Sequence, residues 1–232
     1  MDAAEFDKFA DEYRQLHAQN IRLSGEDPEY FAEYKIADIA GILAGEQTAC
    51  NPVILDFGAG IGKSVPYFQK YFPDCRIVCL DVSKKSLQIG RSRFGDAAEF
   101  VHFDGARLPF PDNSFDIAFL ACVLHHIPHA EHIAILKELR RVVRADGALL
   151  AYEHNPYNPL TVHAVNTCVF DANAQLLEAR KLAVSIREAG FKHPVARYRI
   201  FFPHALRWLR VLEPWLAWLP LGAQYCIHAR NH

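Results

Sequence analysis

Residues 53–62 constrain the fold of this chain more than any other segment. They read VILDFGAGIG, so an apolar run ends in an acid and then in three glycines at every second position. A short apolar run bounded by glycines is typical of a buried strand. Glycine lacks a Cβ and tolerates positive φ, so the amides of the following turn can approach a ligand closely. The segment therefore predicts a buried strand and a ligand-binding turn that opens a helix.

Asp81 ends the next apolar run, residues 76–80. An acid at the tip of a second strand is placed to bind both hydroxyls of a ribose. The dinucleotide spacing Gly-x-Gly-x-x-Gly would require its third glycine at position 63, which is Lys63. A nicotinamide-dependent oxidoreductase is therefore the less favoured interpretation of a nucleotide-type site.

Two further motifs extend the pattern, namely Phe103-Asp104-Gly105 and the apolar residues 115–121 followed by CVLHHI at 122–127. With the glycine turn and Asp81, they resemble the class I S-adenosylmethionine-dependent methyltransferases, of the small-molecule type, over roughly residues 50–153. The resemblance implies an α/β fold with a Rossmann-like, doubly wound, seven-stranded and mostly parallel sheet. It also implies a C-terminal antiparallel hairpin, an N-terminal helical cap and S-adenosyl-L-methionine as cofactor.

We expect one domain over residues 1–232, made of a helical cap (1–48), a cofactor-binding core (49–153) and a substrate-side segment with the closing strands (154–232). Alternating strand and helix patterns in the core predict a parallel sheet. The predicted strands are 52–57, 75–81, 98–103, 115–121, 147–153, 194–202 and 223–229. The predicted helices are 28–45, 62–72, 84–94, 129–143 and 173–189, with an earlier one before residue 24.

Two helix ends carry specific signals. Gly147 follows a basic stretch and is predicted to lie just beyond the end of the helix at 129–143. Asn158 and Pro159 are predicted to be the N-cap and the first residue of another helix.

The resemblance assigns cofactor contacts by position. The glycine turn is expected under the methionine part of the cofactor, Asp81 at the ribose and Val82 against the adenine. Asp104 is expected near the adenine amino group, and Tyr13 in the cap is expected to close over the cofactor. The predicted cofactor-binding residues are Tyr13, Asp56, Gly58, Ala59, Gly60, Gly62, Asp81, Val82, Asp104, Gly105, Ala121 and Cys122. The alternatives are plain structural roles, with Asp81 or Ser83 capping a helix and Tyr13 packing as an ordinary aromatic.

Methyl transfer from a sulfonium is an in-line displacement whose leaving group is a neutral thioether. Alignment and exclusion of water are required, and a base is needed only when the acceptor is protonated. We expect His154 and His126 as base or acceptor contacts, Tyr157 and Asn158 as substrate contacts, and His125 to face away. The predicted reaction is methylation of an oxygen on a small or lipid-linked molecule. The alternative is a non-catalytic partner subunit that keeps the cofactor site.

Histidines and cysteines do not predict a metal centre. His126, His129 and His132 recur every three residues, but no carboxylate or cysteine in the sequence completes an obvious ligand set, so we expect no metal. The six cysteines form no Cys-x-x-Cys pair and several fall in apolar strand patterns. Reduced, buried thiols are typical of a cytoplasmic protein.

Charge and hydropathy limit the partners. The net charge of −2 does not favour nucleic acid, which usually needs a basic surface. No apolar run reaches the roughly 18 residues of a membrane span, and the acidic N-terminus does not resemble a signal peptide. Residues 201–221 hold all three tryptophans. They predict a buried insertion, a homodimer contact or a peripheral membrane contact that meets a lipid-linked acceptor.

Overall fold

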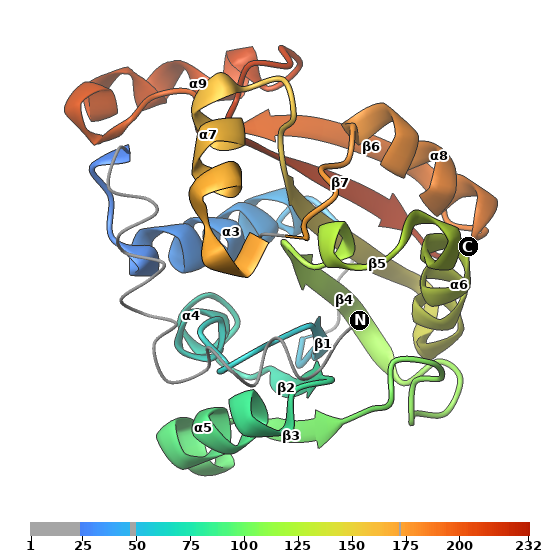
Figure 1. Ribbon diagram of the computed structural model, residues 1–232. Coiled ribbons are helices and arrows are strands. Elements are labelled where there is room, and N and C mark those ends of the chain that lie inside the picture. The colour runs from blue at the N-terminus through green and yellow to red at the C-terminus, as the bar shows by residue number, and fades with distance from the viewer. Residues whose placement is uncertain (1–23, 47–49, 172) are drawn as a thin grey trace.

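A computed structural model of the chain describes residues 24–46, 50–171 and 173–232 (Figure 1). Its centre is a seven-stranded sheet with the strand order β3-β2-β1-β4-β5-β7-β6. The strands from β1 to β5 pair in parallel, whereas β7 lies antiparallel to both β5 and β6. The strands are β1 (Val53–Phe57), β2 (Arg76–Asp81), β3 (Glu99–His102), β4 (Phe115–Ala121), β5 (Val143–His154), β6 (Lys192–Arg199) and β7 (Gln224–Arg230). The predicted doubly wound sheet with a closing antiparallel hairpin is confirmed.

Helices cover both faces of the sheet (Figure 1). The α-helices are α3 (Pro28–Leu43), α4 (Val65–Tyr71), α5 (Lys84–Phe94), α6 (His132–Val142), α7 (Pro159–Thr167), α8 (Ala179–Glu188) and α9 (Glu213–Leu216). Short 3₁₀ helices are η2 (Gly95–Ala97), η3 (Leu124–His126), η4 (His129–Glu131), η5 (Val169–Asp171) and η6 (His204–Leu212). None of the helices within the described residues has both the length and the apolar character needed to cross a bilayer.

Alternating strand residues divide the core into two layers. Ile54 of β1 packs in the layer formed with α3, α4 and α5, while its neighbour Leu55 packs in the layer formed with α6 and α8. This alternation follows from the two-residue period of a strand. Burial on both faces explains why the predicted strands are almost continuously apolar.

The cap helix α3 is joined to the sheet by polar contacts as well as by apolar packing. The Tyr152 hydroxyl donates to Oδ2 of Asp38 at 2.8 Å, and Nε of Arg199 donates to the same oxygen at 2.9 Å. One carboxylate on α3 therefore ties the helix to β5 and β6. The contact places the next inward-facing turn of α3, including Lys35, above the carboxyl ends of the strands.

The predicted capping of α7 is confirmed, and the predicted strand bounds agree within one residue except that β5 begins four residues earlier and β6 spans 192–199 in place of 194–202. Asn158 caps α7, and its side chain accepts a hydrogen bond from the amide of Thr161 at 3.0 Å. Gly147 lies beyond the end of α6 and within the strand, as predicted, but β5 begins at Val143, directly after the helix and four residues before the glycine. A Cβ at this position would lie 2.6 Å from the Val143 side chain. Glycine is therefore required here because the start of the strand is crowded. The helix predicted over 173–189 begins only at Ala179.

Candidate functional site

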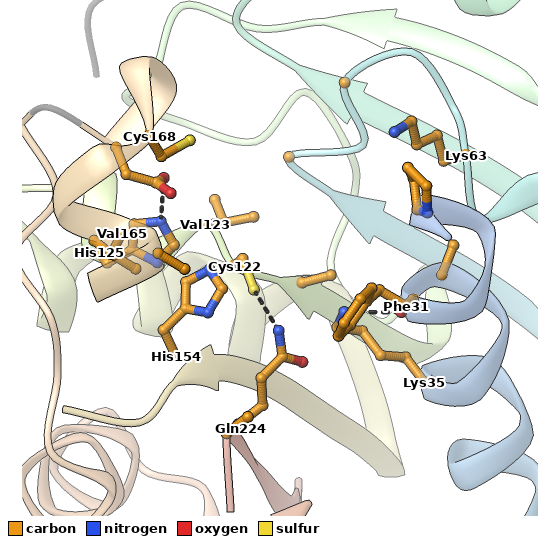
Figure 2. Close-up of a pocket in the computed structure, with 18 of the residues that line it drawn as sticks. Phe31, Lys35, Lys63, Cys122, Val123, His125, His154, Val165, Cys168 and Gln224 are labelled. Carbon is orange, nitrogen blue, oxygen red and sulfur yellow. Dashed lines mark hydrogen bonds and ion pairs between the residues drawn. The ribbon is translucent and has the colours of Figure 1, made fainter. Parts of the chain in front are cut away.

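A cavity of about 390 Å³ lies at the carboxyl ends of the parallel strands (Figure 2). It is lined by the segments that follow β1, β2, β4 and β5, and by residues of α3 and α7. The sheet order reverses between β1 and β4, and such a switch point is where open α/β sheets bind ligands. The volume is in the range of small-molecule sites.

The glycine turn after β1 shapes one half of this cavity. Gly58, Gly60 and Gly62 have φ values of +73°, +54° and +73°, which side-chain-bearing residues rarely adopt. A Cβ on Gly58 would lie 2.5 Å from the side chain of Val123, whereas one on Gly60 would meet nothing within 4 Å. Gly58 is therefore needed for packing, and Gly60 borders open space in which a ligand fits. Gly62 does not line the cavity and packs against Phe100.

Asp81, at the end of β2, holds the glycine turn by hydrogen bonds. Its Oδ2 accepts from the amide of Gly60 at 2.7 Å, and its Oδ1 accepts from the amide of Ser83 at 2.8 Å. Ser83 is the N-cap of α5, since its side chain accepts from the amide of Ser86. The two alternatives weighed from the sequence thus coexist, because Asp81 is buried in the cavity wall while Ser83 caps the helix.

Asp56 is the buried acid beneath the glycine turn. Its side chain is 2% exposed, and its Oδ2 has no hydrogen-bond partner within the described part of the chain. Burial raises the pKa of Asp56 to about 7, a hydrogen bond from Ser64 opposes this rise, and the charge of Asp81 adds to it. A buried carboxylate in the cavity wall with one unpartnered oxygen is suited to an ammonium group, such as that of a methionine moiety.

The other predicted cofactor residues divide into two groups. Ala59, Val82, Ala121 and Cys122 line the cavity. Cys122 has φ of +59°, a strained value for a residue with a side chain, directly after β4. Asp104 and Gly105 do not line the cavity, and Tyr13 lies outside the described residues. Asp104 is exposed, and its Oδ1 accepts from the amide of Ala106 at 3.0 Å.

The opposite half of the cavity is built around the buried carboxylate of Glu153 on β5. Oε1 of Glu153 accepts from the amides of Val123 and Leu124 at 3.1 and 2.8 Å, and Oε2 lies 2.6 Å from Nδ1 of His125. Burial opposes a charge on His125, but Glu153 and Asp171 outweigh it and raise its pKa well above the usual value. The prediction that His125 faces away was wrong, because Glu153 draws its ring into the cavity wall.

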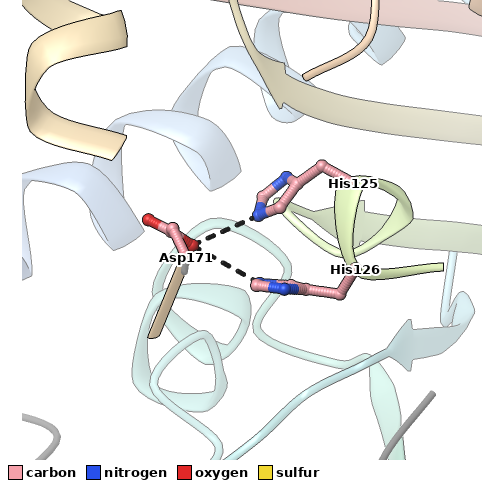
Figure 3. A group of neighbouring side chains, drawn as sticks. All are labelled: His125, His126 and Asp171. Carbon is pink, nitrogen blue, oxygen red and sulfur yellow. Dashed lines mark ion pairs between the residues drawn. The ribbon is translucent and has the colours of Figure 1, made fainter. Parts of the chain in front are cut away.

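Asp171 joins this half from η5. Its Oδ1 lies 3.4 Å from Nε2 of His125 and 3.5 Å from Nε2 of His126 (Figure 3). These are three metal-type ligands that converge within the described residues. The carboxylate missing from the local histidine pattern is thus supplied by a distant segment. His132 takes another role, since its Nε2 contacts the carbonyl oxygens of Leu124 and Ile127 at 2.9 Å.

His154 and His126 both line the cavity, as predicted for acceptor contacts. Figure 2 shows the ring of His154 directed into the cavity between His125 and Cys122, and its centre lies 5.3 Å from that of His125. Burial, together with the charge of His125, lowers the pKa of His154 and of His126 to about 4. Both rings are therefore neutral near pH 7.

Tyr157 and Asn158, the predicted substrate contacts, have separate positions. Asn158 lines the cavity while it caps α7 and donates to the carbonyl oxygen of Leu221 at 2.8 Å. Tyr157 is 54% exposed, does not line the cavity, and donates from its hydroxyl to Oε2 of Glu178 at 2.9 Å.

Lys35, Asp171 and Gln224 line the cavity but were missed from the sequence. Nζ of Lys35 donates to the carbonyl oxygen of Phe31 at 2.9 Å, and burial lowers the pKa of Lys35. Nε2 of Gln224 donates to Sγ of Cys122 at 3.8 Å. A lysine beside the apolar positions of the cap helix was the only local signal, and nothing near Asp171 or Gln224 marks them.

Comparisons with known proteins agree with this geometry. The methyltransferase domain family matches residues 55–151, which span the glycine turn to β5. The match supports a methyltransferase of the class I, S-adenosylmethionine-dependent type. The family, the fold and the cofactor expected from the motifs are thereby confirmed.

Two curated relatives and one solved structure illustrate the similarity. The ubiquinone/menaquinone biosynthesis C-methyltransferase UbiE of Hahella chejuensis is 33% identical over 142 residues, which cover 58% of this chain and 54% of the relative. UbiE of Pseudomonas fluorescens is 31% identical over 158 residues, covering 65% and 58%. The chain thus spans little more than half the length of these relatives. A methyltransferase structure from Thermotoga maritima covers 99% of each chain with a TM-score of 0.69 and 19% identity, which supports the fold alone.

Proposed function

We propose that this methyltransferase transfers the methyl group of S-adenosylmethionine to a ring carbon or ring hydroxyl of an aromatic acceptor with an apolar tail. The observation that carries the proposal is the single cavity that joins the glycine turn to His154. The cofactor would occupy the half around Gly60, Asp81 and Asp56. The acceptor would occupy the half around His154, with its reacting atom in line with the sulfonium.

The rim of the cavity favours an apolar acceptor. Leu160 lines the cavity and is 62% exposed, and Phe201 and Pro203 line it from the segment before η6. Beyond this rim, Trp208, Trp215 and Trp218 are 69 to 74% exposed. A partly exposed apolar rim suits a ligand whose tail extends beyond the reacting ring.

The choice between carbon and oxygen follows from the relatives. The names of the UbiE relatives state carbon methylation in ubiquinone and menaquinone biosynthesis. Loss of a ring hydroxyl proton makes both the oxygen and the adjacent ring carbon nucleophilic. His154 is the proposed hydrogen-bond partner of that hydroxyl. Carbon methylation is therefore the favoured form, in place of the oxygen methylation expected from the histidines alone.

Exposed tryptophans also bear on how the acceptor arrives. Tryptophan is favoured at the boundary between water and lipid, because its ring is apolar and its indole N–H is polar. We propose that the segment that carries the exposed Trp208, Trp215 and Trp218 touches the membrane that holds the acceptor. A homodimer through residues 201–221 is the alternative for this segment.

The test uses methyl-labelled S-adenosylmethionine with hydroquinone and naphthoquinol acceptors, each with and without a prenyl tail. We expect labelled product only with an acceptor, more of it with the tailed forms, and a carbon-bound methyl by mass spectrometry and NMR. A labelled methyl ether would change the reaction to oxygen methylation. Binding of S-adenosylhomocysteine without turnover of any acceptor, even with cell extract added, would instead favour a non-catalytic subunit.

A further inference from the structure

We propose that His125, His126 and Asp171 bind one divalent transition-metal ion of the zinc type in the wall of the acceptor half. Figure 3 shows the two rings of η3 directed at the carboxylate of η5. The three ligand atoms all lie within 4.8 Å of one another. Imidazole nitrogen and carboxylate oxygen are ligands that zinc prefers.

Distances within the group match metal coordination better than direct hydrogen bonding. Oδ1 of Asp171 is 3.4 and 3.5 Å from the two Nε2 atoms, longer than a good N–H···O bond of about 2.7–3.2 Å. Two ligand atoms bound at about 2.0–2.2 Å with a tetrahedral angle lie about 3.3–3.6 Å apart. The two distances from Asp171 therefore fit an ion bound between the carboxylate and each imidazole.

Glu153 completes the outer part of the site. Its Oε2 lies 2.6 Å from Nδ1 of His125, so the proton of a neutral His125 sits on Nδ1 and the lone pair of Nε2 faces Asp171. Metal-binding histidines almost always donate their second nitrogen in this way to a carboxylate or carbonyl group. Nε2 of His125 is buried and makes no hydrogen bond with any described residue, which an ion would remedy.

Charge balance also favours a cation. Glu153 and Asp171 bring two carboxylates into a buried group whose other members are imidazoles. Buried carboxylates require a compensating positive charge. Lys35 acts on Glu153 through its charge, so a divalent ion held by the imidazoles and Asp171 would supply the compensation on the Asp171 side.

Two histidines and one carboxylate leave a coordination position open, as in catalytic metal sites. The inference rests on the proposed function, because the open position would take the ring hydroxyl of the acceptor. Coordination lowers the pKa of that hydroxyl, whose proton passes to solvent. The resulting anion attacks the methyl group, the S–CH₃ bond breaks with its electron pair retained on sulfur, and a C–CH₃ bond forms at the ring. Loss of the ring proton to solvent restores the aromatic ring.

The test is cobalt and zinc binding to the full chain after treatment with a chelator. Titration with Co²⁺ should give the intense visible absorption of a tetrahedral or five-coordinate site at one ion per chain, and Zn²⁺ should displace it. Asp171→Asn and His126→Gln should each weaken Zn²⁺ binding by at least tenfold in calorimetry. His129→Gln, an exposed neighbour outside the group, should bind as the unaltered protein does.

Two measurements on the same samples separate the possible failures. Thermal unfolding shows whether each variant folds, and two different ligand variants guard against one that does not. Unchanged Zn²⁺ affinity in both folded variants, or no cobalt spectrum, would overturn the metal site and favour a protonated His125 held between two carboxylates. Binding of S-adenosylhomocysteine in that protein would leave the proposed function standing. Metal binding without S-adenosylhomocysteine binding would instead count against the proposed function alone.

Discussion

The two halves of the cavity are built in different ways. The cofactor half comes from the turn after β1 and the tip of β2, and its contacts are largely backbone amides and short acids such as Asp81. The acceptor half is assembled by side chains from α3, η3, β5, η5 and β7. The positions of the residues in the cofactor half depend on a local turn, whereas those in the acceptor half depend on long-range packing around Glu153. Substitutions should therefore separate cofactor binding from turnover.

The largest expected effect is on turnover in the acceptor half. His154→Ala should lower kcat by about a hundredfold or more, because loss of an acceptor contact misplaces the reacting atom. Affinity for S-adenosylhomocysteine should change by less than about twofold in calorimetry. His163→Ala, on the exposed side of α7, is the control and should leave both quantities unchanged. An equal loss of cofactor affinity in His154→Ala would mean that the halves are not separate.

Gly58→Ala should damage the cofactor half most. The new Cβ would strain a positive φ and lie 2.5 Å from Val123, so we expect a loss of about 2–4 kcal/mol in unfolding free energy. Affinity for S-adenosylhomocysteine should fall at least tenfold. Gly95→Ala also strains a positive φ, of +54°, but has open space around it. It should lower the unfolding free energy through backbone strain alone, by about 1–3 kcal/mol in chemical denaturation, and leave the affinity unchanged.

Asp81→Ala should weaken the binding of S-adenosylhomocysteine by about 1–3 kcal/mol, since charge-assisted hydrogen bonds to the ribose and to Gly60 are lost. Calorimetric titration measures this change. Asp104→Ala offers the comparison, because Asp104 is exposed and outside the cavity and should have a smaller effect. If Asp104→Ala weakened binding more than Asp81→Ala does, Asp104 would have its predicted role at the adenine, and the cofactor half would extend to this residue.

Asp56 makes the cofactor half sensitive to pH. An acid whose folded pKa is raised to about 7 holds its proton more tightly in the native state. The stability that it contributes is therefore present at low pH and is lost as pH rises from about 4 through 7, by on the order of 2–4 kcal/mol. Asp56→Asn should lack this fall in urea unfolding at pH 4 to 8, while binding S-adenosylhomocysteine more weakly. Parallel pH profiles for the two proteins would contradict the assignment.

The smallest effect on stability is expected outside both halves. The pair Trp215→Ala and Trp218→Ala should change unfolding free energy by less than about 0.5 kcal/mol, because both rings are at least 70% exposed. Co-sedimentation with phosphatidylglycerol vesicles should fall severalfold. Val184→Ala, an exposed apolar residue of α8, should leave vesicle binding unchanged. If the double variant instead lost a dimer in size-exclusion chromatography while its vesicle binding was unaffected, the partner of this segment would be a second copy of the chain and not the membrane.

Sequence reasoning succeeded where a short segment carries its own physical requirement. The three glycines adopt positive φ, and Asp81 follows a buried strand and meets the amides beside it. The sequence did not predict the direction of His125, because it depends on Glu153 of β5, 28 residues further along the chain.

The amino-acid sequence by itself determined the sheet and the glycine turn, because strand periodicity and glycine conformation act over a few neighbouring residues, and the resemblance of its motifs to a known family indicated the cofactor. Only the tertiary structure decided the composition of the acceptor half. Asp171, Lys35 and Gln224 reach the cavity from three distant segments. Their approach depends on how α3, η5 and β7 pack on the sheet. No local pattern records that packing, since the free energy that secures it is spread over the whole buried core.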